Sequence, residues 1–371
     1  MIGRKLFSLV QADGAVALYT EEVDTGPPAA DEVVVRIDAA PVNPSDLLLL
    51  LATADPATAR STGTADRPAM QATIPAHQRA TVAPRVGIPM PVGNEGAGTV
   101  IAAGADAAHL LGKTVACLGR GMFAQYIRVP AAACHVLPDG VTAAQGAASL
   151  INPLTALMMV EVMGAEGHGA LVHTAAASSL GQMLNRICVE DGVPLVNIVR
   201  RQDQADLLRN QGARHVCITS EADFPARLLE ALDETGATIA FDAIGGGPLI
   251  GQLLDGMETV AIRRLPHYSR YGSMTRKTVY IYGLLDSWPI QYHRGFDFSW
   301  NVAGWLLTPY FEALSKQRLA ELWHRISAQL TTTFATRFAD TLSLDEMLAP
   351  VAVERYAQKA TGRKFLIAPH A

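Results

Sequence analysis

The chain has 371 residues, of which 49% are hydrophobic, and its 30 Lys and Arg against 35 Asp and Glu give a formal net charge of -5. This composition is typical of a globular protein of about two domains. Because the sequence contains no basic block that could follow a phosphate backbone, we expect no nucleic-acid partner.

Membrane insertion is not expected either. The apolar runs at residues 47–51 and 170–177 are much shorter than the roughly 20 residues that a spanning helix needs, and residues 1–4 lead into no signal-type segment. The four cysteines are widely separated and form no CxxC pair, which suits a reducing compartment. These features predict a cytoplasmic protein that acts on a small-molecule substrate.

The first part of the chain is patterned as short strands separated by turns. Residues 32–38, 98–102, 113–117 and 123–129 are rich in β-branched or aromatic side chains. This spacing predicts a small antiparallel β-barrel or sandwich over residues 31–138.

After residue 153 the pattern changes to alternating strands and helices. This alternation predicts a doubly wound parallel sheet. Its strands are expected at 170–174, 195–199, 215–219, 238–242 and 278–283, and its helices at 179–191, 204–212 and 224–235. The chain then ends with a predicted helix at 345–358 and a predicted strand at 364–367.

Two segments interrupt this plan. Residues 52–89 are rich in Ala, Thr and Pro and lack a regular period, so we expect a long loop laid over the first domain. Residues 263–277 carry five basic side chains together with His267, Tyr268 and Tyr271. A basic segment of this kind is expected to face water, although it could also fold over a site.

The turn between the strand at 170–174 and the helix at 179–191 is a candidate dinucleotide site. At such a junction backbone amides and the helix dipole can receive a pyrophosphate. On the GxGxxG pattern the three positions are Ala176, Ser178 and Gly181, so only the last glycine remains. The alternative is an ordinary turn with a serine N-cap.

The second strand of this region ends in Arg200 and Arg201, where an NAD-binding protein would carry Asp or Glu. Two guanidinium groups suit the 2′-phosphate of NADPH, because Arg offers planar, charge-assisted donors. The alternative is that both arginines only solvate a loop. The glycine-rich run 242–247 closes the next strand at the same edge.

Several motifs, in order along nearly the whole chain, resemble the medium-chain dehydrogenase/reductase superfamily, especially its zinc-free quinone oxidoreductase and enoyl thioester reductase branches. These motifs are Ala40-Pro-Val-Asn-Pro-Ser-Asp46, Val92-Gly-Asn-Glu-Gly-Ala-Gly98, Asn152-Pro-Leu-Thr-Ala156, the turn through Gly181, Leu207-Leu-Arg-Asn-Gln-Gly-Ala213 and Ala360-Thr-Gly-Arg-Lys-Phe365.

The resemblance implies an α/β protein with a GroES-like β-barrel catalytic domain at 1–145 and 320–371, a Rossmann NADP-binding domain at 146–319, and a homodimer. Zinc-dependent members place Cys, His and Cys where this chain has Asn43, Asn94 and Ile151. Zinc prefers thiolate and imidazole ligands, so no metal site is expected.

The resemblance also implies the site. Asn43, Ser45 and Thr155 are the candidate catalytic residues, with Ser45, Tyr268 and Tyr271 as candidate proton donors. The candidate NADPH-binding residues are Asn43, Asn152, Thr155, Ala176, Ser178, Ser179, Leu180, Gly181, Arg200, Arg201, Gln204, Asp242, Gly283 and Lys364. Glu95 matches a glutamate that supports the floor of the family's cleft, and a structural carboxylate is the preferred interpretation.

The expected activity is hydride transfer from NADPH to a quinone or an electrophilic enone. Enoyl thioester reductases carry a Tyr shortly after the Asn-Pro-Ser-Asp stretch, and residues 47–91 contain none. A hydroquinone anion can take its proton from solvent, whereas an enolate gains more from a placed acid. Enoyl thioester reduction and non-catalytic NADPH binding remain the alternatives.

Overall fold

The structure is a computed structural model that describes residues 1–286, 288–292, 295 and 297–371. The chain divides into two compact units: unit 1 comprises Met1–Ile151 and Ser327–Ala371, and unit 2 comprises Asn152–Ile326. The boundaries expected from sequence, at 145/146 and 319/320, lie six and seven residues earlier than these.

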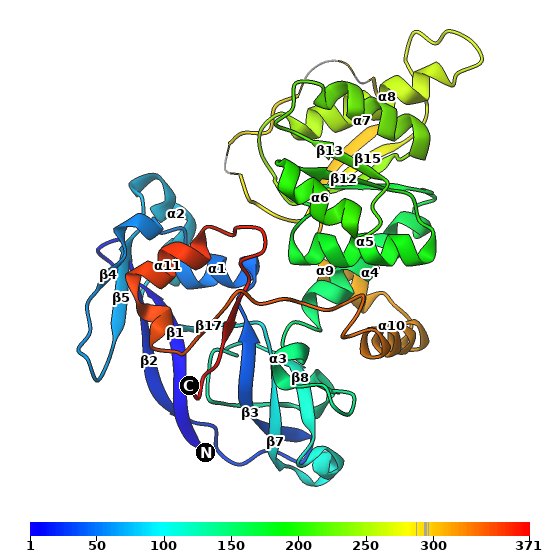
Figure 1. Cartoon of the computed structure of the whole chain (residues 1–371). Helices are drawn as coiled ribbons and strands as arrows, with labels where there is room; N and C mark the ends of the chain where they lie inside the picture. The colour runs from blue at the N-terminus through cyan, green and yellow to red at the C-terminus, as the bar shows by residue number, and fades with distance from the viewer. Residues whose placement is uncertain (287, 293–294, 296) are drawn as a thin grey trace. The chain divides into compact units, whose positions relative to one another are not determined.

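Unit 1 is built mainly from antiparallel strands (Figure 1). One sheet has the order β4-β5-β2-β1-β6, and a second has the order β10-β8-β7-β3-β18-β17, with β9 also paired to β3. The strands are β1 (Ile2–Val10), β2 (Ala15–Asp24), β3 (Glu32–Pro41), β4 (Arg60–Ser61), β5 (Ala69–Thr73), β6 (Met90–Pro91), β7 (Glu95–Ala103), β8 (Thr114–Leu118), β9 (Tyr126–Pro130), β10 (Cys134–Val136), β17 (Asp340–Leu342) and β18 (Phe365–Ile367).

The core of unit 1 joins its two ends in sequence. Val35 and Ile37 of β3 are fully buried and belong to the same cluster as Phe123 and the C-terminal residues Phe365 and Ile367. Strand β18 pairs antiparallel with β3, so the end of the chain completes a sheet that starts near residue 32. The helices of unit 1 are α1 (Pro44–Leu51), α2 (Arg79–Val82), α3 (Ala143–Gly146) and α11 (Pro350–Ala357).

The prediction that residues 52–89 form a loop is wrong in part. This segment contains β4 and β5, and β5 pairs antiparallel with the long strand β2. Met70 and Ala72 of β5 are buried while their neighbours are less so, which is the period of a half-buried strand. Alanine and glutamine dominate these five residues, so the side chains carry little strand propensity and pairing to β2 determines the structure.

Unit 2 contains one parallel sheet with the order β13-β12-β11-β14-β15-β16 in the described part of the chain. Its strands are β11 (Leu171–His173), β12 (Leu195–Val199), β13 (His215–Ile218), β14 (Ile239–Asp242), β15 (Lys277–Ile281) and β16 (Trp300–Gly304). Every neighbouring pair is parallel. The strand order reverses beside β11, as in a doubly wound sheet.

Apolar helix faces cover both sides of this sheet. Leu228 of α7 (Phe224–Thr235) and Leu253 of α8 (Leu249–Arg263) share a buried cluster with Val196. Leu208 of α6 (Gln202–Asn210) shares another with Val199. The two clusters lie on opposite faces because odd and even residues of β12 point to opposite sides. The predicted α/β fold class is therefore confirmed.

The remaining helices of unit 2 are α4 (Ile151–Ala165), α5 (Ser179–Asp191), α9 (Leu307–Glu312) and α10 (Lys316–Ala328), where α4 and α10 cross the unit boundaries. The stretch Ala143–Ala165 is long and apolar enough to cross a membrane by length and composition alone, and 78% of an apolar 18-residue segment of it is buried inside the structure. Burial of this kind is also typical of the core helix of a soluble protein.

The predicted helix at 345–358 is interrupted. A short 3-10 turn at Glu346–Leu348 ends before Ala349, whose backbone is extended, and α11 starts at Pro350. The residue before a proline avoids helical backbone angles because the proline ring would clash with it. Pro350 therefore starts a new helix instead of continuing the old one.

The prediction that residues 263–277 only face water is wrong at the last residue. Lys277 is fully buried and its ammonium forms an ion pair with the equally buried Glu258 of α8. It also donates to the Ser273 hydroxyl at 3.0 Å and to the Thr275 carbonyl at 2.7 Å. Tyr268 is 93% exposed, so the middle of the segment does face solvent.

Candidate functional site

The carboxyl ends of the parallel strands in unit 2 meet at one edge of the sheet. Thr174 follows β11, Arg200 follows β12, Asp242 ends β14 and Tyr282 follows β15. In open α/β sheets a ligand binds at this edge, beside the strand where the order reverses. Arg200 and Asp242, both predicted from the sequence, are thus brought to a common edge together with residues that were not predicted.

The turn after β11 has the backbone of a close helix-to-strand junction. A Cβ atom added to Gly181 would lie 2.3 Å from the Ala176 carbonyl oxygen, so no larger residue fits there without movement. Ala175 adopts a left-handed φ of 49°, which an L-residue rarely takes outside constrained turns. The single glycine that this turn retains is the one that packing requires.

Ser178 is the N-cap of α5. Its hydroxyl oxygen accepts a hydrogen bond from the Gly181 amide at 3.1 Å. Ala176 is fully buried, while Ser178, Ser179 and Leu180 are half-buried. Ser178 is therefore a helix N-cap, as the alternative interpretation predicted. The Ser178 hydroxyl can still donate its proton to a ligand, and the first turn of α5 is only partly buried.

Arg200 and Arg201 are both exposed but engaged differently. The Arg201 guanidinium donates to both carboxylate oxygens of Asp203, with Nε to Oδ1 at 2.9 Å and Nη2 to Oδ2 at 3.0 Å. The Arg200 guanidinium makes no ion pair or side-chain hydrogen bond with the residues that the structure describes. Arg200 is thus the arginine whose charge is available to an anion.

Gln204 fixes the backbone that presents these arginines. Its side-chain oxygen accepts from the Arg200 amide at 3.0 Å and from the Arg201 amide at 3.2 Å. The Ser220 hydroxyl donates to the Arg200 carbonyl at 2.7 Å. Gln204 is nearly buried, so its contribution in this structure is to hold the loop.

Asp242 is a buried carboxylate that closes the turn after β14. It accepts hydrogen bonds from the Thr174 hydroxyl at 2.6 Å and from the amides of Ile244 at 3.2 Å and Gly245 at 2.7 Å. Burial raises the pKa of Asp242, and these three hydrogen bonds oppose that rise. The carboxylate therefore ties the ends of β11 and β14 together.

Gly283 is required for close approach of two loops at the same edge. A Cβ atom added to it would lie 2.6 Å from the Ala243 carbonyl oxygen. Gly245, with a φ of 76°, faces the Gly283 carbonyl in the same way. Glycines at both positions therefore let the loops after β14 and β15 approach each other closely.

His173 and Tyr282 form a polar pair inside this edge that sequence patterning does not reveal. The His173 Nε2 atom and the Tyr282 hydroxyl are 2.7 Å apart, and the two rings are stacked. Burial lowers the pKa of His173 to about 3. The imidazole is therefore neutral at physiological pH.

Unit 1 holds a second polar cluster, formed by Asn43, Glu95 and Lys364. The Lys364 ammonium donates to Asn43 Oδ1 at 2.7 Å, and Asn43 Nδ2 donates to Glu95 Oε1 at 2.8 Å. Asn43 and Glu95 are buried, at 2% and 0% exposure. Asn43 and Lys364, both candidate cofactor residues, are thus brought together, and both functional groups of the Asn43 amide are engaged.

Both carboxylate oxygens of Glu95 accept hydrogen bonds. Its second oxygen, Oε2, accepts from the amides of Leu150 and Ile151, each at 3.1 Å. Burial raises the pKa of Glu95, while the Lys364 charge and these hydrogen bonds oppose the rise. A carboxylate with this many donors is a structural anchor, which was the preferred interpretation from the sequence.

Asp46 lies beside this cluster and is fully buried. Its Oδ2 atom accepts from the Asn43 amide at 2.8 Å, which caps helix α1. Burial raises the pKa of Asp46 to about 7, and the nearby Glu95 adds to the rise. The Asn-Pro-Ser-Asp motif contains this residue, but only the structure shows that its carboxyl group is buried.

The positions that match zinc ligands do not suit a metal. Asn43 is committed to Glu95 and Lys364, and the Asn94 amide donates to the Ser45 hydroxyl at 3.3 Å. Ile151 offers only its backbone amide, which bonds Glu95. Amides are poor zinc ligands. In the described residues no group of three or more His, Cys, Asp or Glu is placed to hold a metal ion.

The other candidate residues are distributed between the units. Ser45 is an exposed residue of α1 in unit 1. Asn152 and Thr155 are buried residues of the first turns of α4 in unit 2, at 8% and 6% exposure. Tyr271 is 53% exposed on the segment 263–277.

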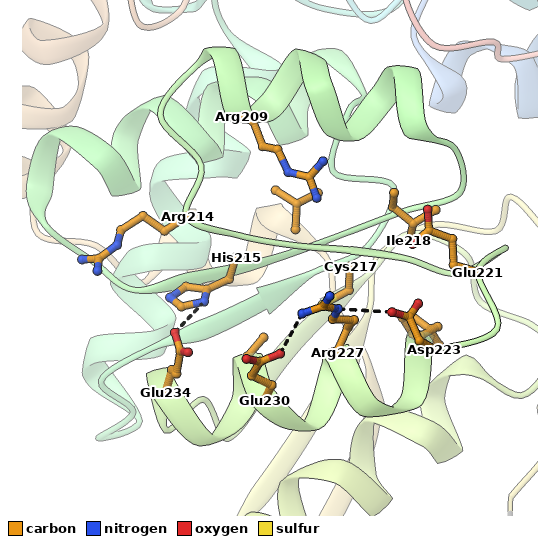
Figure 2. Close-up of a pocket in the computed structure, with 13 residues that line it drawn as sticks. Arg209, Arg214, His215, Cys217, Ile218, Glu221, Asp223, Arg227, Glu230 and Glu234 are labelled. Atoms are coloured by element: carbon orange, nitrogen blue, oxygen red, sulfur yellow. Dashed lines mark hydrogen bonds and ion pairs between the residues drawn. The ribbon is translucent and has the colours of Figure 1, made fainter.

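A pocket of about 380 Å³ lies beside edge strand β13, between α6 and α7 (Figure 2). Figure 2 shows Arg227 between Asp223 and Glu230, and His215 beside Glu234. Its three arginines face four carboxylates, so this pocket presents little net charge to a ligand. It lies outside the strand-end residues described above.

Comparison with known proteins bears on both units. Residues 29–139 match the alcohol dehydrogenase GroES-like domain. Over 164 residues the chain is 30% identical to the synaptic vesicle membrane protein VAT-1 homolog of Rattus norvegicus, a match covering 43% of this chain and 40% of that protein. Over 177 residues it is 28% identical to the quinone oxidoreductase of Pseudomonas aeruginosa, covering 46% and 54%. The matches thus span about half the length of these curated relatives.

Solved structures match over nearly the whole chain. A Mesorhizobium loti protein assigned provisionally as an NADPH:quinone reductase aligns at 24% identity and a TM-score of 0.71, over 99% of this chain and 98% of that one. The Escherichia coli quinone oxidoreductase complexed with NADPH aligns at 17% identity and a TM-score of 0.70, over 99% and 100%.

An enoyl thioester reductase of Candida tropicalis, in a mutant form, aligns at 19% identity and a TM-score of 0.67, over 99% of this chain and 100% of that one. At these identities the likeness shows the fold. The predicted resemblance is confirmed at the level of the fold: the chain has the fold shared by these quinone and enoyl thioester reductases, and its residues 29–139 match the alcohol dehydrogenase GroES-like domain.

Proposed function

We propose that this chain is an oxidoreductase that binds NADPH at the carboxyl edge of the parallel sheet in unit 2 and reduces a small electrophile, either a quinone or an electrophilic enone. The observation that carries the proposal is the exposed Arg200 guanidinium, which follows β12 and has no side-chain partner among the described residues. An unpaired guanidinium at this position suits a phosphate dianion.

The residues at this edge fit such a cofactor. The absence of a Cβ at Gly181 lets α5 pack closely on the turn after β11, and the first turn of α5 offers backbone amides to a pyrophosphate. Gly245 and Gly283 let the loops after β14 and β15 approach each other closely. By the family resemblance, Asn43 and Thr155 are proposed to border the nicotinamide, and Asn152, Ser179, Leu180 and Lys364 to line the rest of the cofactor site.

NADPH supplies a hydride when it is bound, so the contribution of the chain is to bind, orient and exclude water. The cluster Lys364–Asn43–Glu95 fixes the segment around Asn43, since each polar group has a partner. Ser45 is proposed as a weak proton donor at most, because it is exposed and bonded to Asn94.

A quinone is favoured over an enoyl thioester because residues 47–91 contain no tyrosine. Two-electron reduction of a quinone gives a hydroquinone anion that solvent can protonate, whereas an enolate gains about 100-fold from a placed acid. The relatives that include the Pseudomonas aeruginosa quinone oxidoreductase support the same choice. Enoyl thioester reduction is the second candidate, supported by the likeness to the Candida tropicalis enzyme.

The direct test follows loss of NADPH absorbance with a panel of quinones, enones and enoyl thioesters, with NADH in parallel. We expect turnover with quinones or enones and a clear preference for NADPH. Turnover only with enoyl thioesters would favour the second candidate. Saturable NADPH binding without turnover on any member of the panel would support a non-catalytic NADPH-binding protein, and absence of NADPH binding would refute the proposal.

We also propose that the protein is a homodimer, as the family resemblance implies. Strand β16 is the last strand of its sheet in the described part of the chain, and its Trp300 is 40% exposed. An exposed sheet edge is available for pairing with another chain. Sedimentation of the purified protein tests this state, and a monomer at micromolar concentration would contradict it.

A further inference from the structure

Two of the four cysteines lie directly opposite each other on neighbouring antiparallel strands. Cys117 of β8 pairs with Cys134 of β10, and the same register continues through Val115 and Val136. Side chains opposite each other in an antiparallel pair leave the sheet on the same side and meet. The two thiols are therefore neighbours across the sheet although 16 residues separate them in sequence.

The hydrogen-bond pattern defines which kind of cross-strand pair they form. The Leu137 amide donates to the Thr114 carbonyl at 2.9 Å, so Leu137 and Thr114 form a hydrogen-bonded pair. Bonded and non-bonded pairs alternate along an antiparallel ladder, and three steps along this register lead to Cys134 and Cys117. The cysteines therefore occupy a non-hydrogen-bonded pair, in which the Cα atoms are about 4.5 Å apart. A disulfide spans Cα separations of roughly 4.4–6.8 Å.

The two thiols differ in accessibility and acidity. Cys134 is half-buried at the start of β10, and its interaction with the Cys117 thiol lowers its pKa. Cys117 is fully buried, and its interaction with Cys134 together with its burial raises its pKa well above the usual value. Cys134 is thus the reactive member because the thiolate is the nucleophile, and Cys117 is the neighbour that can resolve its oxidised form.

The other two cysteines lack this arrangement. Cys188 of α5 and Cys217 of β13 are both 2% exposed, and burial raises the pKa of each to about 12. Neither residue lies opposite another cysteine in the described sheets. They supply internal controls for selective oxidation.

We propose that Cys117 and Cys134 form a reversible cross-strand disulfide when the protein meets hydrogen peroxide. The Cys134 thiolate attacks one peroxide oxygen, the O–O bond breaks, and the products are a Cys134 sulfenic acid and water once the leaving hydroxide takes a proton. The Cys117 sulfur then attacks the sulfenic sulfur, and the Cys117 proton leaves with the sulfenic oxygen as a second water. Two thiols are oxidised and one peroxide is reduced.

The proposed disulfide lies close to the buried carboxylate of Glu95. On its other side β8 pairs with β7, where Cys117 lies opposite Gly96, the residue after Glu95. The Glu95 charge reaches the Cys117 thiol, since it contributes to the rise in the pKa of that thiol. Oxidation at Cys117 therefore takes place beside the anchor of the Asn43–Lys364 cluster.

The test treats the full-length protein with hydrogen peroxide, blocks the remaining thiols with an alkylating reagent and analyses the products by mass spectrometry. We expect loss of two of the four free thiols, a mass decrease of about 2 Da and a linked pair of peptides containing Cys117 and Cys134, all reversed by dithiothreitol. A variant with Cys188→Ser and Cys217→Ser should behave in the same way.

Variants at the pair distinguish the two roles. Cys117→Ser should leave a sulfenic acid at Cys134 that a dimedone probe labels, and Cys134→Ser should keep Cys117 unreacted under the same dose. Peptide mapping of the wild-type protein gives an answer even where a variant fails to fold. Over-oxidation of Cys134 while Cys117 still alkylates, equal oxidation of all four cysteines, or no thiol loss would overturn the proposal.

Discussion

The Lys364 ammonium lies 2.7 Å from Asn43 Oδ1, although the two residues are 321 positions apart in sequence. This contact joins the residue that precedes β18 to the N-cap of α1, the helix that follows β3, and through Asn43 it continues to Glu95. The segment that contains β18 therefore completes a polar cluster as well as a sheet. Breaking this cluster at Lys364 leaves Glu95 and Asn43 buried with fewer partners.

We predict that Lys364→Met lowers the free energy of unfolding by about 3 kcal/mol, because removing one member of a buried charged network leaves the other uncompensated. Urea unfolding followed by circular dichroism measures the change. Lys113→Met is the matched control, since Lys113 is exposed in the same unit, and it should change the free energy by less than about 0.5 kcal/mol. Adding Glu95→Gln to Lys364→Met should recover part of the loss, and full additivity of the two changes would contradict a coupled cluster.

Asp46 predicts a pH dependence of stability. Its pKa is raised from 3.8 to about 7 in the folded chain, so the folded state holds a proton that the unfolded state releases between those values. Stability from this group is complete below about pH 4 and is lost as the pH rises toward 7, with a slope of up to about 1.4 kcal/mol per pH unit. Asp46→Asn keeps an oxygen to accept from the Asn43 amide and removes the titration.

The measurement compares urea unfolding of the wild type and Asp46→Asn at pH 5 and pH 8. The variant should gain stability relative to the wild type at pH 8, and the difference should shrink or reverse at pH 5. Parallel curves over this interval would show that Asp46 is ionised in the folded protein at both values.

Much of the fold follows from local pattern. The bounds predicted for α5, α7 and β12 agree with the structure, because each has a clear period and ends at a cap or turn, such as Ser178 before α5 and Gly192 after it. Strand β5 is missed because its Ala and Gln residues show no period until β2 pairs with them. The break at Ala349 follows from Pro350, a signal present in the sequence.

The candidate site likewise contains some residues that the sequence predicts and others that it does not. Motif order places Asn43, Gly181, Arg200 and Lys364, whose neighbours in the structure give each a physical role. Partners distant in sequence cannot be read from a single chain, so the pairing of Arg201 with Asp203 is visible as a local pattern while that of His173 with Tyr282 is not. Burial of Asp46 and Lys277 likewise depends on tertiary packing.

The difference between Arg200 and Arg201 predicts unequal contributions to NADPH binding. Arg200→Glu should weaken NADPH binding by 10-fold or more, because a charge-assisted contact contributes about 1.5–3 kcal/mol. Arg201→Glu should have a smaller effect, since the Arg201 guanidinium is already paired with Asp203. Fluorescence titration measures both, with NADH as the ligand that lacks the phosphate and Arg209→Glu as a control on the adjacent helix. Equal weakening of NADPH and NADH by Arg200→Glu would argue against a phosphate contact.

Gly181 predicts a packing requirement that is independent of the cofactor. Gly181→Ala places a Cβ 2.3 Å from the Ala176 carbonyl, so α5 must shift and stability should fall by about 2 kcal/mol. Gly164→Ala is the matched control: it also lies in a helix, but nothing lies within 4 Å of its added Cβ, and it should stabilise the protein by up to about 1 kcal/mol. Thermal unfolding of both variants tests the contrast, and equal shifts would contradict it.

Burial of the neutral His173 imidazole should make the free energy of unfolding fall in acid. Burial lowers its pKa from 6.5 to about 3, so between these values the unfolded chain binds a proton that the folded chain does not. Stability contributed by the neutral imidazole is present above about pH 6.5 and falls as the pH drops toward 3, by up to about 1.4 kcal/mol per pH unit. His173→Gln removes this titration and retains a group that can bond the Tyr282 hydroxyl.

Urea unfolding at pH 7 and pH 5 measures this effect. Between the two pH values the free energy of unfolding should fall less for His173→Gln than for the wild type. His109→Gln, at an exposed histidine, is the control and should lose as much stability as the wild type. The same acid loss in all three proteins would mean that a protonated His173 is tolerated inside the fold.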